Sequence, residues 1–125
     1  NTITDEISWV NGGHQPALLR DKNGKFEQVE SAAPPMGVLQ QKNKSLYKIN
    51  RTKLNGKRFY AFTDGLSESL DSKGNEIGIE GSIKIIEKNF NDDVSKQLSN
   101  IAKDVEKFSG KNKLSDDLTL IAIGK

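Results

Sequence analysis

The chain has 125 residues with a net charge of +2; 34% of them are hydrophobic, 29% are charged, and none is cysteine. This length suits one domain or part of one, and no apolar run approaches the roughly 20 residues of a membrane span. The absence of cysteine excludes disulfides, thiolate zinc sites and cysteine nucleophiles, and it fits a cytoplasmic protein. The lysines are scattered and form no basic block with aromatic residues, so we expect a solvated surface with no nucleic-acid or membrane partner.

The first third of the chain is predicted to form strands and turns. Residues 7–10 (ISWV) read as a short strand that runs into the glycines of NGGH. Residues 16–30 (PALLRDKNGKFEQVE) read as a β-hairpin around Asn23-Gly24, because these two residue types tolerate positive φ. Residues 31–39 (SAAPPMGVL) are predicted to be a loop, since their prolines and glycine continue neither a helix nor a central strand.

Two more strands are expected in the middle of the chain. The first includes Leu46, Tyr47 and Ile49, and the second runs from Phe59 to Phe62, after a turn at Asn55-Gly56. The second strand stops abruptly at the sequence TDGLS, which we interpret as the start of a long loop. That loop contains a tight turn of its own at residues 73–75 (KGN).

The hydrophobic period then changes from 2 to about 3.6, which predicts two helices. The first presents one face formed by Ile79, Ile83, Ile86 and Phe90. The second begins at a cap formed by Asp92 or Asp93, ends at Gly110, and carries an apolar stripe formed by Val94, Leu98, Ile101, Val105 and Phe108. We interpret this stripe as a core face rather than a groove for a partner.

The chain closes with residues 118–124 (LTLIAIG), a strand that is apolar on both faces and is therefore expected to be central in a sheet. The order of strands, helices and a final strand predicts an α+β fold in which helices pack on a mostly antiparallel sheet.

Two acidic segments adjoin predicted strands. Asp64 follows FYAFT, and Asp116-Asp117 precedes LTLIAI. If these strands are antiparallel neighbours, Asp64 and Asp116 converge on one edge of the sheet, where a hard divalent cation such as Mg²⁺ or Mn²⁺ would relieve their repulsion. Gly65 would permit a tight turn and the close approach of backbone or phosphate. Each segment also has a plainer interpretation, Asp-Gly as a turn and Asp-Asp as a guard against aggregation.

Other candidate sites are weaker. Residues 71–81 (DSKGNEIGIEG) fail as a calcium loop, because Lys73 stands at a ligand position and Glu76 stands where glycine is needed. His14 is the only histidine, so histidine-based metal clusters are excluded. As a loop residue His14 is interpreted as a hydrogen-bonding anchor rather than a catalyst.

Five segments, taken in order, resemble a known family: WVNGGHQPALL, PPMGVL, FYAFTDGLSES, GNEIGIEG and SDDLTLIAI. Together they are similar to the second half of the catalytic domain in the bacterial SpoIIE-type branch of the PP2C-like (PPM) metal-dependent protein phosphatases. The resemblance runs from about Ile7 to Gly124. Gly12 stands where the family usually shows alanine, a change that should not disturb the site.

The resemblance implies a sandwich of two antiparallel sheets with helices on the outer faces (α-β-β-α), of which residues 1–125 would form the C-terminal part of a single domain. It implies two Mn²⁺ or Mg²⁺ ions in the complete domain, with Asp64 and Asp116 as ligands. Asp117 would lie beside the site as an alternative ligand, next to Gly65. The implied reaction is hydrolysis of a serine or threonine phosphate by a metal-bound water, without a protein nucleophile.

In this branch the substrate is typically a phosphorylated STAS-type anti-anti-sigma protein in a bacterial stress or sporulation switch. The family also needs an earlier DxxGHG-like motif whose aspartate bridges both metals, and residues 1–8 contain nothing similar. We therefore expect the isolated chain to bind one ion weakly, to show little activity, and to associate with another copy through uncovered strand edges. The alternatives are a non-catalytic phosphatase-like binding module and an unrelated α+β module in which Asp64 and Asp116 lie far apart.

Overall fold

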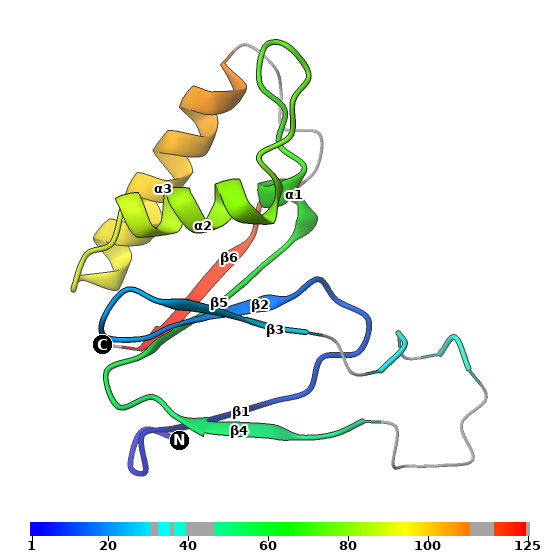
Figure 1. Cartoon of the computed structure of the whole chain (residues 1–125), viewed down its shortest axis with the longest axis vertical. Helices are drawn as coiled ribbons and strands as arrows, with labels where there is room; N and C mark the ends of the chain where they lie inside the picture. Colours follow the sequence, from blue (N-terminus) through cyan, green and yellow to red (C-terminus); the bar gives the residue numbers. More distant parts are fainter. Residues whose placement is uncertain (31–32, 36, 40–46, 111–116, 125) are drawn as a thin grey trace.

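The computed structural model describes residues 1–30, 33–35, 37–39, 47–110 and 117–124 and arranges them in layers: a two-stranded sheet, a four-stranded sheet and a pair of helices (Figure 1). The elements in chain order are β1 (Glu6–Trp9), β2 (Ala17–Arg20), β3 (Phe26–Val29), β4 (Asn50–Lys53), β5 (Arg58–Phe62), α1 (Asp64–Ser67), α2 (Gly78–Lys88), α3 (Val94–Ser109) and β6 (Leu120–Gly124). None of these described helices combines the length and apolarity of a membrane span.

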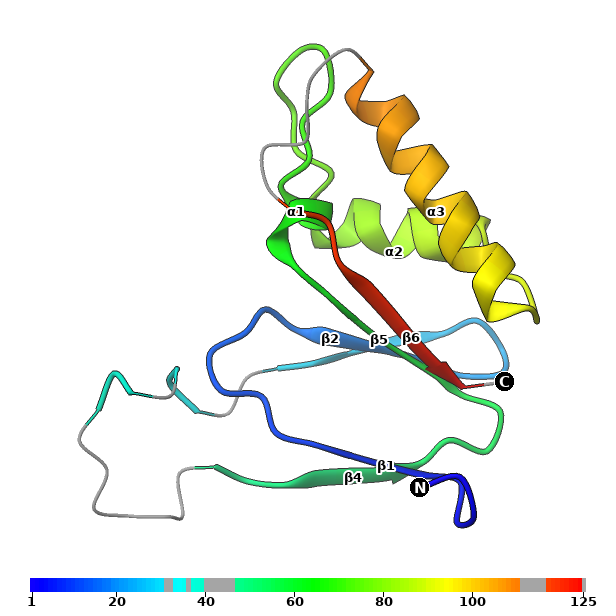
Figure 2. The same cartoon turned by 180° about the vertical axis from the view of Figure 1, so that it is seen from behind.

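The larger sheet has the strand order β3-β2-β5-β6, and every neighbouring pair in it is antiparallel. The smaller sheet pairs β1 with β4, also antiparallel. Viewed from behind, β6 is seen to lie alongside β5, under the two long helices (Figure 2). The predicted α+β fold with two antiparallel sheets is therefore confirmed, and the helices of the described residues cover the outer face of the larger sheet.

The two faces of the larger sheet bury different apolar clusters. Leu18 and Tyr60 are opposite each other in the β2–β5 register and face the helices, where Ile86 and Ile101 meet them. The next register pair, Leu19 and Phe59, faces the β1–β4 sheet instead. Full burial of one such side chain contributes about 1.5–3 kcal/mol, so both contact layers hold the strands in place.

Two of the three turns predicted at glycines share one hydrogen-bond pattern, which explains why each forms locally. Asp21 Oδ1 accepts hydrogen bonds from the backbone N–H groups of Asn23 (2.8 Å) and Lys25 (2.9 Å). Asp71 Oδ1 accepts the same pair from Lys73 (2.8 Å) and Asn75 (2.9 Å). The stretch rejected above as a calcium loop is thus a turn whose carboxylate is used by its own backbone.

Stability should depend on pH through these two carboxylates. The side chain and backbone N–H groups of Asn75 lower the pKa of Asp71, and the backbone N–H of Lys25 lowers that of Asp21. A lowered folded-state pKa means that the stabilisation is present above the ordinary value of about 3.9 and is lost as the pH falls through the folded-state value. We expect Asp71→Ala to be less stable than the wild type at neutral pH in urea unfolding, with a difference that shrinks in acid. A difference that is constant with pH would contradict this.

The α3 prediction is largely confirmed. Asp93, one of the two predicted caps, accepts from the N–H groups of Ser95 (3.0 Å) and Lys96 (3.2 Å), and Gly110 follows the last residue with a φ of 60°. Ile101 and Val105 of the predicted stripe are buried. The stripe interpretation missed Gln97, which is completely buried although it is polar.

Gln97 is buried because its side-chain oxygen accepts a hydrogen bond from Arg58, an arginine at the start of β5 that is only 1% exposed. The Arg58 Nη1 donates to Gln97 Oε1 (2.7 Å) and to the backbone oxygen of Asn91 (2.6 Å). The guanidinium also lies over the ring of Phe90, 4.9 Å from its centroid. Phe90 was predicted on the helical face, but α2 ends at Lys88 and the ring packs against arginine instead.

One strand lies later in the chain than predicted. The strand expected to include Leu46, Tyr47 and Ile49 forms later, as β4, and it pairs with β1; Leu46 lies outside the described residues. The predicted turn at Asn55-Gly56 is present, with φ values of 45° and 80°. This turn connects β4 of the smaller sheet to β5 of the larger one. Just before it, Leu54 N donates to Asp5 O (2.8 Å), which keeps the end of β4 next to the chain before β1.

The final strand β6 lies at the edge of its sheet, not in the centre as its double apolar pattern predicted. Leu120 and Ala122 pack against the helix-facing core. Ile121 and Ile123 are opposite Ala61 and Phe59, hence on the sandwich side, yet they are 51% and 43% exposed. Both faces of β6 are apolar, so both favour burial. The helices cover the face with Leu120 and Ala122, but the described part of the smaller sheet leaves the face with Ile121 and Ile123 largely exposed.

Candidate functional site

The end of β5 is fastened to the segment that precedes β6. Thr63 N donates to Thr119 O (3.0 Å), and Thr119 N donates back to Thr63 Oγ1 (2.9 Å). The Thr63 hydroxyl itself donates to the backbone oxygen of Asp117 (2.7 Å). One threonine therefore joins the two chain segments on which the sequence placed the candidate carboxylates.

Asp64 is the first residue of α1, a single helical turn where the sequence predicted only a loop. Its neighbours Gly65, Leu66 and Ser67 are buried, whereas Asp64 itself is exposed. Ser69 Oγ donates to Gly65 O (2.6 Å), which ties the end of the turn back to its beginning. The Asp64 carboxylate therefore lies exposed at the end of β5, and the three residues that follow it are buried.

Gly65 is required here by space. A Cβ built at this position would lie 2.6 Å from the carbonyl oxygen and 2.9 Å from the carbonyl carbon of Asp117. These atoms belong to backbone, so they have little freedom to move aside. The absence of a side chain at Gly65 lets the chain around Asp117 approach the beginning of α1.

The predicted site residues stand as follows. Asp64 and Gly65 lie at the rim, and Asp117 is exposed beside them, with its backbone joined to Thr63. Asp116 lies outside the described residues, so the predicted convergence of Asp64 with Asp116 stays a prediction. The antiparallel pairing on which that prediction rested is present, since Phe62 is opposite Leu120.

Sequence reasoning missed a pocket that opens next to Asp64. This pocket has a volume of about 310 Å³ and is lined by Gly13, His14, Gln15, Thr63 and Asp64. Gln15 Nε2 donates to Phe62 O, and Ser67 Oγ donates to Gln15 Oε1 (3.0 Å). Since Gln15 precedes β2 by two residues and β2 pairs with β5, the strand register was the signal that could have located it.

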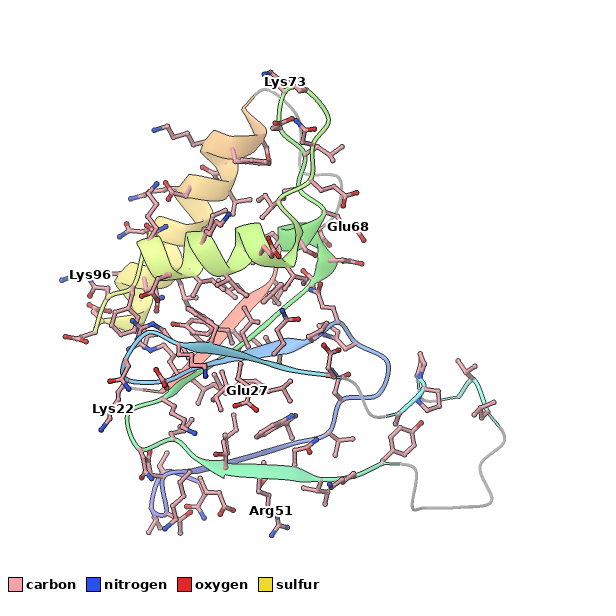
Figure 3. The ribbon with its side chains drawn as sticks, viewed as in Figure 1. Lys22, Glu27, Arg51, Glu68, Lys73 and Lys96 are labelled. Atoms are coloured by element: carbon pink, nitrogen blue, oxygen red, sulfur yellow. The ribbon has the colours of Figure 1, made fainter. Side chains whose placement is uncertain are left out.

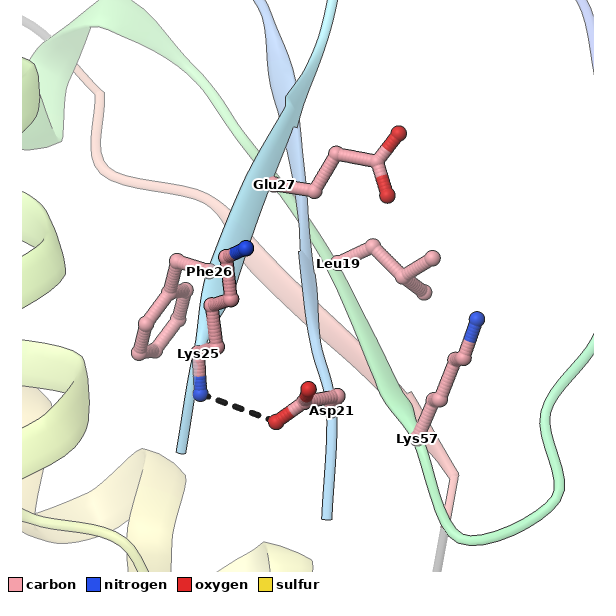
Figure 4. Close-up of a pocket in the computed structure, with 6 residues that line it drawn as sticks. All are labelled: Leu19, Asp21, Lys25, Phe26, Glu27 and Lys57. Atoms are coloured by element: carbon pink, nitrogen blue, oxygen red, sulfur yellow. Dashed lines mark hydrogen bonds between the residues drawn. The ribbon is translucent and has the colours of Figure 1, made fainter. Parts of the chain in front are cut away.

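Another hollow lies at the opposite end of β5, where the hairpin turn meets the residue before the strand (Figure 4). It is about 320 Å³ in volume and is lined by Leu19, Asp21, Lys25, Phe26, Glu27 and Lys57. The Asp21 carboxylate in it is used by the backbone of the turn, and charges of both signs surround it. This hollow does not share a residue with the rim at Asp64.

The donor chemistry at the rim suits a hard divalent cation in part. Its candidate ligands are carboxylate oxygens, which Mg²⁺ and Mn²⁺ prefer. Within the described residues, however, no group of three or more histidine, cysteine, aspartate or glutamate side chains could hold a metal ion. Asp64 alone would be a weak site, and it fits as one ligand of a larger set.

A model of the family described as Stage II sporulation protein E (SpoIIE) matches residues 1–125. No curated protein sequence matches the chain.

Solved structures share the fold. The SiaA-PP2C domain of Pseudomonas aeruginosa has a TM-score of 0.79 at 15% identity, over 98% of this chain and 47% of that one. The SpoIIE phosphatase domain of Bacillus subtilis, presoaked with Mn, has a TM-score of 0.68 at 12% identity, over 99% and 52%. The RsbU and RsbW domains of a Mycobacterium tuberculosis protein have a TM-score of 0.67 at 21% identity, over 95% and 32%. The chain therefore spans about half, or less, of these solved chains.

Proposed function

This chain belongs to the SpoIIE family of PP2C-like phosphatase domains, and on that premise we propose that it supplies one side of the divalent-cation centre of a protein serine/threonine phosphatase. Asp64 and Asp116 would be cation ligands, and Asp117 would be the alternative ligand. Gly65 would keep the backbone of Asp117 close to Asp64. The chain would be the C-terminal part of one such phosphatase domain.

The observation that carries the proposal is the fastening of β5 to the β6 segment through Thr63. It brings Asp64 close to Asp117, at a rim that is open to solvent. When bound there, Mn²⁺ or Mg²⁺ would supply Lewis-acid activation of water and neutralise charge on a phosphoryl group. The chain's own residues would hold the cation, keep the strand ends together and present the pocket of Gly13 to Gln15 to the substrate.

The substrate we propose is a phosphoserine or phosphothreonine on a regulatory protein, of the STAS type that the family resemblance implies. The pocket is compatible with this class, because exposed residues such as His14 and Asp64 frame it and leave it accessible to a phosphorylated loop of another protein. A Ser/Thr hydrolysis of this kind needs no protein nucleophile, in keeping with the absence of cysteine.

A non-catalytic binding module is the second candidate. It is favoured by the lack of a group of three or more metal-ligating side chains among the described residues. Mg²⁺ takes six ligands in near-octahedral geometry and keeps several waters, so the remaining partners would have to be solvent and other groups. We accordingly expect one weak cation site and little hydrolysis by this chain alone.

The test is a Mn²⁺ titration of the full chain, followed by electron paramagnetic resonance, beside an assay of phosphate release from a phosphoserine peptide. We expect weak, saturable Mn²⁺ binding and release close to the uncatalysed background. A chain that binds no Mn²⁺ at all would contradict the proposed centre. Rapid, Mn²⁺-dependent release would contradict the expected inactivity and exclude the binding module.

We also propose that the chain associates with itself through β6. Its outer edge is unpaired among the described strands, and Ile121 and Ile123 expose apolar surface beside it. Such an edge favours pairing with another strand. We expect a concentration-dependent rise of molecular mass in sedimentation equilibrium and a weaker rise for Ile121→Lys. A wild-type chain that stays monomeric at high concentration would refute the association.

A further inference from the structure

We propose that His14 binds the phosphoryl group of the substrate through its Nε2 atom, in the pocket beside Asp64; this inference rests on the proposed function. The sequence suggested only a hydrogen-bonding anchor for this residue. In the structure, Nδ1 of the ring is hydrogen-bonded to the backbone, and Nε2 on the other side of the ring is available for a ligand.

The pocket has room for such a ligand. Its volume of about 310 Å³ is many times the roughly 10–15 Å³ that a cavity needs to hold one water molecule on the same measure, so space does not exclude a phosphoryl group. His14 and Asp64 both line this pocket, the first from the loop before β2 and the second from the end of β5. A phosphoryl group bound there would lie near both the histidine and the proposed cation ligand.

Hydrogen bonds fasten the loop that carries His14 to itself and to β5. Asn11 Oδ1 accepts from the backbone N–H of His14 (2.9 Å), and Asn11 Nδ2 donates to Gln15 O (3.3 Å). Gly13 has a φ of 80°, and a Cβ there would overlap the ring of Pro35, so Pro35 packs directly against the loop. Gln15 joins the same loop to β5. The backbone that carries the imidazole is therefore tied to neighbouring parts of the chain.

The ring itself is oriented by one hydrogen bond. His14 Nδ1 lies 3.1 Å from the backbone oxygen of Gln15. A carbonyl oxygen only accepts, so this contact assigns a proton to Nδ1. Nε2 makes no hydrogen bond within the part of the chain that is described, and when the ring carries both protons it donates to an anionic oxygen. Such charge-assisted bonds are the stronger class.

Two other roles fit less well. As a cation ligand, His14 would add a nitrogen to a set of carboxylates that suits hard ions, which prefer oxygen. As a structural anchor it would need only Nδ1 and the backbone N–H, and the exposed ring adds nothing to the core. Phosphoryl binding accounts for three features together: the Nε2 atom without a described hydrogen bond, the pocket beside it and the exposure of the ring.

The experiment follows the imidazole by nuclear magnetic resonance, which is unambiguous because His14 is the only histidine. Inorganic phosphate is added to the full chain in the presence of a chelator, with sodium chloride at equal ionic strength as the reference. We expect a saturable shift of the ring proton and nitrogen resonances with phosphate but not with chloride. The absence of a phosphate-specific shift would overturn the proposal without the need for any variant.

Variants then assign the binding. Followed by the phosphorus resonance, His14→Gln should weaken phosphate binding about tenfold, the effect of losing one charged hydrogen bond. Glu68→Gln, an exposed change at the end of α1 whose side chain points outward (Figure 3), should leave the binding unchanged. Equal phosphate affinities of wild type and His14→Gln would contradict the role of His14.

The same histidine signal separates this inference from the proposed function. Mn²⁺ bound at Asp64 would broaden the His14 resonances through its unpaired electrons. Broadening by Mn²⁺ with no effect of phosphate leaves the cation centre standing and overturns the role of His14. A phosphate shift without any Mn²⁺ binding supports His14 and overturns the cation centre.

Discussion

Replacing Gly65 with alanine is expected to lower the free energy of unfolding by about 1–3 kcal/mol, the usual cost of forcing extra volume into a well-packed region. The added methyl group would lie 2.6 Å from the backbone oxygen of Asp117, well inside contact distance. Either α1 or the segment before β6 must move. Because Thr63 holds that segment with its hydroxyl and its N–H, the movement should also strain the hydrogen bonds to Asp117 and Thr119.

Urea unfolding of the variant measures this cost, and Gly12→Ala is the matched control. A Cβ at Gly12 has the Tyr47 ring as its nearest neighbour, at an ordinary contact distance of 3.4 Å, and alanine is the residue that the family resemblance implies for this position. Gly12→Ala should change the stability by less than about 0.5 kcal/mol, as surface changes usually do. If Gly65→Ala were as stable as Gly12→Ala, the contact with Asp117 would not be what requires glycine.

Features with local causes were predictable from the sequence. The turns at Asn23-Gly24 and at residues 73–75 form through an aspartate and the backbone N–H groups that follow it within four residues. The cap of α3 is also local, since Asp93 serves N–H groups two and three residues on. Signals of this kind lie within one window of sequence, and tertiary packing has no need to override them.

Features that depend on distant partners were not predictable. The apolar pattern of β6 records two faces that favour burial, but it cannot say whether a second sheet reaches as far as Ile121. Gln97 reads as a surface residue until Arg58, 39 positions earlier, is found to need its oxygen. His14 and Gln15 join the rim only through the β2–β5 register. In each case the position of the residue is set by pairings between strands or layers.

The site is therefore built mainly from backbone. Thr63 ties two chain segments together through main-chain groups, Gly65 is required by a carbonyl, and Gln15 reaches the backbone oxygen of Phe62. The carboxylate of Asp64 makes none of the hydrogen bonds just named, and the residue is exposed. The scaffold of the rim and the carboxylate that it presents can thus be changed separately.

That separation makes Asp64→Asn the sharpest test of the cation centre. The change keeps the shape of the side chain and removes its charge, at an exposed position, so the free energy of unfolding should stay within about 0.5 kcal/mol of the wild type. Loss of a residue that merely supports a metal ligand typically costs about 10–100-fold in metal affinity. Loss of a direct ligand should weaken Mn²⁺ binding by at least about tenfold on the same grounds.

Isothermal titration with Mn²⁺ gives the affinities, with Glu68→Gln as the control for charge. Glu68 lies at the end of the same helical turn, is exposed, and points away from the molecule (Figure 3). Its substitution removes the same unit of charge near the rim without removing a proposed ligand, so it should alter Mn²⁺ affinity by less than about twofold through screened, long-range attraction alone. If Asp64→Asn binds Mn²⁺ as tightly as Glu68→Gln, then Asp64 only ends a strand and begins a helical turn. A selective loss in Asp64→Asn would instead assign the cation to the rim where β5 meets the segment before β6.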